Sequence, residues 1–557
     1  MRLKFPISLL FFVATGVVLL LQMIPVVGIF LMFMLAMFWS VLLVNAGMVG
    51  IAIEALIGRV SRGWAIIPII FYAGYWMLAV SEHKKLEELS AFYVATNNQV
   101  AIPFSPNQQS LAFSNSGNGA WFTQNYSLPV AYSTNSNFPE GYLSNRMMDH
   151  SVCQEVRKRP ALRAAFVHAF GFHDGDAIGD RKMEKRFCAM SMPERPELPI
   201  VQIAKQEKKI FEGSLPVTRI TTTVTTPDGQ RFQLLGGFAA PLSWLPMPVM
   251  GCGLNSGAPS WDCGAQFWRK GFTPIVSGNT KYSRDSVVLA NALGLKNVSK
   301  TDRIGGDPNF VRAKMEAVES STLERQLFNM DAMIEDPFAK VNDWQVGVVA
   351  SRPEVLSSKA EDIMTGIERA VKTTKKNRYR ARESGRILAR LIAKLPKDQF
   401  VQFGPRLLAI YAKADDEHWL WESETLLRRL GDLGIEALPY LVNPRASRSS
   451  VNGAGIEGLC RVGSAGRTVA EPALLGLWKK SRDGFDRDAR FAMFVAMRRI
   501  GVSPPPLSED KRGDFSRMQK EWADISPQSP SRVCAVRAEK QARREEKFSG
   551  ERRTNIN

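Results

Sequence analysis

Charged side chains are almost absent from the first part of this 557-residue chain, where Glu54 is the only one between Phe5 and Ile57. A bilayer crossing takes about 20 apolar residues, so a run of about 50 is too long for one ordinary span and long enough for two. Pro25 and Gly28 interrupt the run and favour a tight turn between the spans. A third apolar stretch, "AIIPIIFYAGYWMLAV", follows. We therefore predict a membrane anchor at 1–81 with three transmembrane helices, near 7–24, 28–52 and 64–81.

The first apolar stretch also lacks a small-residue cleavage site after it, although its "MRLK" start is typical of a signal peptide. The apolar run continues into the next span, so we expect the first helix to be retained. Basic residues near the span ends favour the cytoplasmic side. Under the three-span model they are Arg2, Lys4, Arg59 and Arg62 on one side and Lys84 and Lys85 on the other. The bias predicts an inner (plasma) membrane protein with a cytoplasmic N-terminus and residues 82–557 periplasmic or extracellular.

Cysteine is missing from the anchor, because all six cysteines follow the last predicted span. An even number of cysteines in an exported region is typical of disulfides. A bond between Cys252 and Cys263 would close the loop "CGLNSGAPSWDC" and contribute about 3 kcal/mol on the chain-entropy model. The further candidate pairs are Cys153 with Cys188 and Cys460 with Cys534. The alternative is a set of unrelated buried thiols, and nothing in the spacing suggests a zinc site.

Histidine is scarce as well, with five residues in the chain, and the familiar catalytic motifs are missing. There is no P-loop, no GxGxxG after a strand and no GxSxG elbow. The stretch "HAFGFHDGDAIGD" collects imidazole and carboxylate groups, which are ligands for divalent cations. Its spacing matches neither HExxH nor an EF-hand, so a polar surface turn is favoured and no cofactor is predicted. The weak metal candidates are His168, His173, Asp174 and Asp176.

The region 82–345 is predicted to be an exported α+β domain. Residues 89–139 contain no charged side chain and are rich in Asn, Ser and aromatics, which suits short strands or a solvated connector. The Thr- and Val-rich stretch around "PDG" predicts a β-hairpin near 217–236, because Pro and Gly favour the turn. Helical patterns return in "DSVVLANALGL" and "NFVRAKMEAVESSTLERQLFNMDAMI". Three tryptophans surround the candidate disulfide loop, as its small core or as an aromatic binding face: Trp244, Trp261 and Trp268.

From about 354 onward the chain is predicted to be helical, with a long, mostly uninterrupted helical pattern at 360–395. This stretch is rich in lysine and arginine, and the whole chain carries a net charge of +18. A basic surface can bind anionic lipid headgroups or an acidic partner, whereas the exported compartment argues against nucleic acid. The same residues suit a solvated helix face, because lysine and arginine are good surface helix formers. The interaction candidates are Arg378, Arg380, Arg382 and Arg386.

A short pattern recurs in this helical region: "LRRLGDLG" at 427–434, "LCRVGSAG" at 459–466 and, less fully, "MRRIGV" at 497–502. "LIAKLP" at 391–396 is a weaker earlier copy. Glycine just past a helix end can take the left-handed conformation that closes the helix, and nearby aliphatic residues then point into the seam between two helices. Such helix pairs must stack to cover their apolar faces. The predicted corner residues are Leu430, Gly431, Val462, Gly463, Ile500 and Gly501.

Over about 385–505 this pattern resembles HEAT or armadillo-like α-helical repeats. The resemblance implies a curved, α-solenoid-like helical domain at 354–505 that binds a partner, and an ordinary helical bundle is the alternative. Most of the charged segment 506–557 is predicted to be a mobile tail, with at most one isolated helix.

Two functions remain open at this point. The leading hypothesis is a membrane-anchored scaffold of the bacterial cell envelope, whose helical domain binds another protein. The alternative is a membrane-bound enzyme that acts on an envelope substrate through the middle domain. A reversed topology would instead put the basic helix in the cytoplasm, against nucleic acid or lipid.

Overall fold

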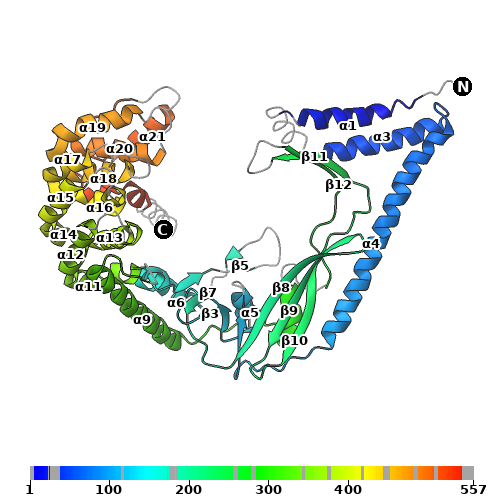
Figure 1. The fold of residues 1–557 in the computed structure, drawn as a ribbon, viewed down its shortest axis with the longest axis horizontal. Helices are drawn as coiled ribbons and strands as arrows, with labels where there is room; N and C mark the ends of the chain where they lie inside the picture. Colours follow the sequence, from blue (N-terminus) through cyan, green and yellow to red (C-terminus); the bar gives the residue numbers. More distant parts are fainter. Residues whose placement is uncertain are drawn as a thin grey trace, which may run out of the picture. The chain divides into compact units, whose positions relative to one another are not determined.

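The computed structural model describes residues 5–22, 24, 38–114, 118–171, 173–174, 182–183, 186–254, 261–276, 284–299, 301–341, 345–372, 378–414, 419–442, 452–480, 487–506 and 512–541. The chain divides into two compact units. The first contains Met1–Gln154 and His168–Val311, and the second contains Glu155–Val167 and Arg312–Asn557. The first unit combines N-terminal helices with a mixed sheet, and the second is helical (Figure 1).

The N-terminal helices are α1 (Leu9–Gln22), α3 (Phe38–Leu56), the short 3-10 turn η1 (Arg62–Ala65) and α4 (Ile66–Asn98). Two helical stretches, Trp39–Leu56 and Arg62–Asn98, are long and apolar enough to cross a membrane, while Leu9–Gln22 is shorter. Glu54, the isolated acid of this region, is held by α1: its carboxylate accepts hydrogen bonds from the amide of Ile7 (2.9 Å) and the hydroxyl of Ser8 (2.7 Å). Part of the predicted second span lies outside the described residues.

Helix α4 continues well past the end of its apolar stretch and docks on the sheet of the same unit. Leu89 and Tyr93 are buried there with Leu215 and Val217. The side-chain amide of Asn97 both donates to and accepts from the main chain of Leu235, each at 2.8 Å. The helix therefore joins the apolar helices to the α+β region as one continuous rod.

The sheet has nine strands in the order β13-β10-β9-β8-β1-β2-β3-β7-β4. It is mixed, because β1 pairs in parallel with both β2 and β8, whereas β8, β9 and β10 pair antiparallel. Figure 1 shows β8, β9 and β10 as long neighbouring strands. The strands are β1 (Ser110–Phe113), β2 (Ala131–Thr134), β3 (Tyr142–Asp149), β4 (His168–Phe170), β7 (Phe187–Pro193), β8 (Ile200–Glu212), β9 (Leu215–Thr225), β10 (Arg231–Ala239) and β13 (Thr273–Pro274).

The predicted hairpin is present as β9 and β10, which pair from Arg231 opposite Thr225 to Ala239 opposite Val217. Its turn is closed as the sequence suggests. Gly229 has a positive φ of 86°, and the hydroxyl of Thr226 donates to the Asp228 carboxylate. The turn that Pro-Asp-Gly predicts is therefore present in the structure.

The stretch at 89–139 is only partly the strands or connector that its composition favours. Besides β1 and β2 it contains the end of α4 and the helix α5 (Asn118–Tyr126). The residues of α5 have weak helix propensity, but the ring of Phe122 is fully buried against Phe113, with ring centroids 5.1 Å apart. Burial of aromatic area outweighs local propensity here.

One further helix and two strand pairs also belong to the first unit. Helix α8 (Arg284–Ala292) contributes Leu289 to the core against the sheet. Strands β11 (Pro248–Leu254) and β12 (Trp261–Phe267) form a separate antiparallel hairpin that contacts α1 and α3. Strands β5 (His173–Asp174) and β6 (Lys182–Met183) form a two-residue ladder. A buried ion pair joins Arg146 on β3 to Glu194 after β7, with Nη2 and Oε1 2.9 Å apart.

The second unit is built from helices and 3-10 turns around one core. After α6 (His150–Lys158), which the division of the chain crosses, these are α7 (Pro160–Ala164), α9 (Pro308–Glu335), α10 (Gly347–Ala350), α11 (Pro353–Ser358), α12 (Ala360–Lys372), α13 (Arg378–Ile392), α14 (Lys397–Gln402), α15 (Gly404–Lys413), η2 (Trp419–Glu422), α16 (Glu424–Leu430), η3 (Gly431–Ala437), α17 (Leu438–Leu441), α18 (Asn452–Val462), η5 (Gly463–Gly466), α19 (Arg467–Lys480), α20 (Arg487–Ile500), α21 (Arg512–Glu521) and η8 (Ser531–Cys534).

Two expectations about the C-terminal region need correction. The pattern at 360–395 is not one long helix but the pair α12 and α13, which pack on each other. Each carries an apolar face, for example Ile367 and Leu388, and folding back covers both faces. The predicted tail at 506–557 is also wrong over 512–541. Trp522 and Cys534 are buried in the helical core there. Burial of the indole and the disulfide to Cys460 hold this segment in place, although many of its residues are charged.

Candidate interaction surface

The predicted corners occur where helices of the second unit meet. Leu430 ends α16 and Ile500 ends α20, and both are fully buried, while Val462 at the end of α18 is half-buried. These aliphatic side chains therefore fill the seam between helices, as the pattern predicts. They belong to the core rather than to a binding face.

The glycines of the three corners are not equivalent. Gly463 and Gly501 have φ values of 75° and 87°, the left-handed conformation expected after a helix end. Gly431 does not: its φ is −61°, and the left-handed residue of that corner is Gly434, with φ 78°. Gly431 is needed for a different reason. A Cβ there would overlap the carbonyl oxygen of Gly458 and lie 2.8 Å from the Cβ of Arg461, so α16 and α18 can approach only over a glycine.

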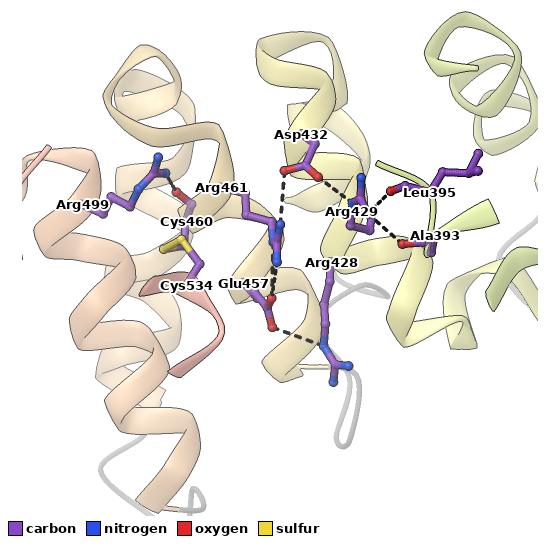
Figure 2. Close-up of polar contacts among 10 residues, drawn as sticks. All are labelled: Ala393, Leu395, Arg428, Arg429, Asp432, Glu457, Cys460, Arg461, Arg499 and Cys534. Carbon is purple, nitrogen blue, oxygen red and sulfur yellow. Dashed lines mark hydrogen bonds and ion pairs between the residues drawn. A yellow bond between two sulfur atoms is a disulfide. The ribbon is translucent and has the colours of Figure 1, made fainter. Parts of the chain in front are cut away.

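The arginines that precede two of the corners reach back to the end of an earlier helix. Arg429 donates from Nη1 to the main-chain carbonyls of Ala393 (2.8 Å) and Leu395 (2.9 Å), at the end of α13 (Figure 2). Arg499 donates in the same way to the carbonyl of Cys460, at the end of α18. Ala393 and Cys460 occupy the same place in "LIAKLP" and "LCRVG". The same contact is therefore made twice, between different helices.

Arg461, the middle member of the series, makes an ion pair instead. Its guanidinium lies 3.3 Å from Asp432 and 3.0 Å from Glu457 (Figure 2). The other oxygen of Asp432 lies 2.6 Å from Nε of Arg429, so this buried carboxylate joins two successive arginines. Arg428 extends the network to Glu457 at 3.4 Å.

These contacts suit a structural role better than catalysis. Burial lowers the pKa of Arg499, and the charge of Arg461 acts in the same direction, against Asp432. Arginine nonetheless stays charged in proteins, so it holds carbonyls and carboxylates without exchanging protons. We call Arg428, Arg429, Asp432, Glu457, Arg461 and Arg499 the arginine ladder.

Exposed apolar side chains also follow two of the corners in the sequence. Ile435 in η3 and Val469 in α19 are both exposed, and η3 and η5 contact each other. Ile435 directly follows Gly434, and Val469 lies three residues after Gly466. We call Ile435 and Val469 the corner surface. Exposed apolar side chains at two successive helix corners are suited to protein contact.

The basic residues of α13 form no concentrated anion site in the described part of the chain. Arg382 pairs with Glu422, and Arg386 lies 3.3 Å from Glu383. Arg380 is exposed, and the side chain of Arg378 lies outside the described residues. A cleft of about 220 Å³ beside α13 is lined by residues of both signs: Arg386, Arg390, Glu422, Ser423, Glu424 and Thr425. Arg382 and Arg386 are therefore ion-paired surface residues rather than parts of a basic stripe.

The metal candidates are not brought together by the described residues. His168 is half-buried on β4, with its ring centroid 5.9 Å from that of Phe170. The side chains of His173 and Asp174, and all of Asp176, lie outside the described residues. Within the described ranges, no group of three or more His, Cys, Asp or Glu side chains is placed to hold a metal ion.

Two cysteine pairs lie at disulfide distance. Cys153 is joined to Cys188, with Cα atoms 6.5 Å apart, and Cys460 to Cys534, with Cα atoms 5.7 Å apart. In the β11–β12 hairpin the register places Cys252 directly opposite Cys263, which is itself disulfide-bonded.

The residues that sequence reasoning passed over are the arginines. The corner candidates were the aliphatic residues and the glycines, yet an arginine stands two positions before the corner glycine in every copy: Arg429, Arg461 and Arg499. This regular spacing was the available signal. Comparison with protein-family models, curated proteins and solved structures finds no match to this chain.

Proposed function

We propose that this protein is a membrane-anchored scaffold of the bacterial cell envelope, with its exported C-terminal helices binding another protein. The anchor is supported by the apolar helices α3 and α4, which leave large apolar side chains such as Ile70 and Met77 exposed. Water disfavours such a surface and lipid accepts it. The disulfides at Cys153–Cys188 and Cys460–Cys534 favour an oxidising compartment for the remainder of the chain.

The arginine ladder is the observation that carries the scaffold. Arg429 and Arg499 make the same backward contact to the ends of two different helices, in step with the sequence pattern. A contact that repeats with the sequence favours a stack of HEAT-like units over a bundle with coincidental glycines. Stacks of this kind present one extended surface, and the corner surface is the part that we assign to the partner.

The compartment can be tested by labelling single introduced cysteines in spheroplasts with a membrane-impermeant thiol reagent. Phe211→Cys, on the exposed end of β8, should react before lysis. Arg59→Cys, on the loop between α3 and α4, is the matched control and should react only after lysis. The reverse pattern would show that the proposed orientation is wrong.

Partner binding can be tested by photocrosslinking in intact cells. A photoreactive amino acid at Ile435 or Val469 should yield the same adduct with a second protein, because both belong to the corner surface. Val401 on α14 is exposed in the same unit but lies outside that surface, so it serves as the control. No adduct at either corner position, or equal adducts at Val401, would remove the proposed binding surface.

A further inference from the structure

A segment of the α+β region lies against the apolar helices of the same unit. Residues 242–250 lead from β10 into the first residues of β11, and we call them the strap. The strap and hairpin are almost free of charge: Asp262 is the only charged residue between Arg231 and Arg269. Pro246 and Pro248 also remove two backbone donors from the strap.

The strap is irregular chain up to Met247, yet each main-chain carbonyl from Leu242 to Pro248 has a hydrogen-bond partner. Most of the donors are side chains of the apolar helices. The hydroxyl of Tyr75 on α4 donates to Ser243 O (2.7 Å) and lies 3.1 Å from Leu245 O, which also accepts from the Ser243 hydroxyl. The indole of Trp76 donates to Trp244 O at 3.1 Å.

The remaining carbonyls of this stretch also have hydrogen-bond partners, most of them side chains of the apolar helices. His83 Nε2 lies 3.0 Å from Leu242 O, Asn45 donates to Pro246 O (3.1 Å), Ser40 donates to Pro248 O (3.0 Å), and the amide of Trp268 donates to Met247 O (2.8 Å). Ser40 and Asn45 belong to α3 and His83 to α4. Both apolar helices therefore contribute to the strap.

The base of the strap is fixed by one buried acid at the end of the apolar part of α4. Glu82 accepts from the amide of Leu242 at 2.9 Å. It also pairs with Arg269 through both carboxylate oxygens, at 2.8 and 3.1 Å. The strap thus begins where charge returns to α4, and it runs from there toward the start of α3.

Main-chain carbonyls need protein hydrogen-bond partners in lipid, whereas in water they do not. Water can satisfy an exposed carbonyl, whereas each unsatisfied one in hydrocarbon costs several kcal/mol. Irregular backbone at membrane depth is stable only where protein groups take its hydrogen bonds. Polar side chains on otherwise apolar helices supply those bonds here. Meanwhile Trp244 and Leu245 remain more than half exposed, and the Trp244 ring stacks on His83 with centroids 4.2 Å apart.

Resting on the proposed membrane anchor, we infer that the strap is immersed in the exported leaflet of the bilayer, with Trp244 and Leu245 contacting lipid. Ser40 near the start of α3 and His83 on α4 both lie away from the loop that joins these helices, which agrees with this depth. Tryptophan at the polar end of a span suits the headgroup boundary. The chain then meets lipid through side chains of an irregular segment as well as through its helices.

Spin labels in the full-length protein, reconstituted in phosphatidylcholine–phosphatidylglycerol liposomes, test this directly. A label at Leu245→Cys, where the native side chain is 63% exposed, is compared with labels at Ile70→Cys (66%) and Phe211→Cys (75%). Lipid favours collision with oxygen and water favours collision with a nickel chelate. We expect the Leu245 label to lose nickel accessibility relative to Phe211 and to resemble Ile70.

The outcomes separate the two proposals. If Ile70 reports lipid but Leu245 behaves like Phe211, the strap is in water and this inference fails while the anchor stands. If the Leu245 label is shielded from both oxygen and nickel, protein rather than lipid covers the strap, and the inference also fails. If Ile70 itself behaves like Phe211, the membrane anchor fails and the strap inference falls with it.

Discussion

Arg499 on α20 donates a hydrogen bond to the main-chain carbonyl of Cys460 on α18, and through Nε it donates to the carbonyl of Ser529 at 3.0 Å. One side chain therefore connects two helices and the segment before η8. Cys460 is also the residue that is bonded to Cys534. A guanidinium and a disulfide thus meet at the same point of the helical core.

Replacing Arg499 by methionine should weaken this point. The methionine retains apolar bulk but removes the donors, so two carbonyls lose a charged partner, at an expected cost of about 1–3 kcal/mol. Hydrogen exchange of the full-length protein in detergent should show easier opening of α20. Arg498→Met is the matched control, because the neighbouring guanidinium makes only an exposed 3.3 Å contact to Ala523 O. Equal effects at both positions would contradict the role given to Arg499.

Three glycine substitutions should separate close packing from backbone strain. Gly431→Ala has an ordinary helical φ but meets the carbonyl of Gly458, so overpacking should cost about 1–3 kcal/mol. Gly463→Ala should also destabilise, because a φ of 75° strains any side chain and the guanidinium of Arg499 is 3.2 Å away. Gly453→Ala, in α18 with open space around it, should be neutral or gain up to about 1 kcal/mol. Urea unfolding of the full-length protein measures all three, and a stable Gly431→Ala would refute the close approach of α16 and α18.

The disulfide between Cys460 and Cys534 should stabilise the C-terminal helices. It spans 74 residues, so the chain-entropy model predicts a contribution of about 4 kcal/mol. The double variant Cys460→Ala/Cys534→Ala should therefore lower the thermal midpoint and expose 512–541 to protease. The unmodified protein treated with a reductant is the comparison, and it should change in the same direction. Unchanged protease resistance in both samples would show that packing alone holds this segment.

Asp285 should make the first unit less stable as pH rises. Burial raises the pKa of its carboxyl, against the opposing effects of Lys205 and the Gly237 amide. The folded state then binds more protons than the unfolded state above about pH 4, so stability falls as pH increases through the raised pKa. Asp285→Asn should flatten this decline in urea unfolding followed at α8.

Asp228 provides a control of opposite sign. The Thr226 hydroxyl lowers the pKa of the Asp228 carboxyl, so its contribution is present above the ordinary aspartate pKa and is lost as pH falls. Asp228→Asn should therefore remove stability at neutral pH rather than at acidic pH. A variant of Asp285 with the same profile as Asp228→Asn would contradict the assignment of burial as the cause.

Local sequence patterns correctly predicted the elements whose formation depends on residues close together in the chain. The hairpin around "PDG" formed where Pro and Gly favour its turn, although it runs two or three residues further at each end. Helix α5 was missed for the converse reason. Its weak propensity is overcome by burial of Phe122 against Phe113, residues that the sequence does not show to be neighbours. The tail was misread in the same way, since its charges conceal Trp522.

The sequence by itself determined the apolar beginning of the chain, the mixed middle region, the helical end and the spacing of its corners, because periodicity and charge act over short distances. Only the tertiary structure decided which glycine is left-handed, what the corner arginines hold, and which side chains satisfy the strap. Gly431 and Gly463 have the same local pattern and opposite backbone conformations. Gly431 lies against α18 and Gly463 faces the guanidinium of Arg499, and contacts between residues far apart in the chain cannot be read from the local sequence.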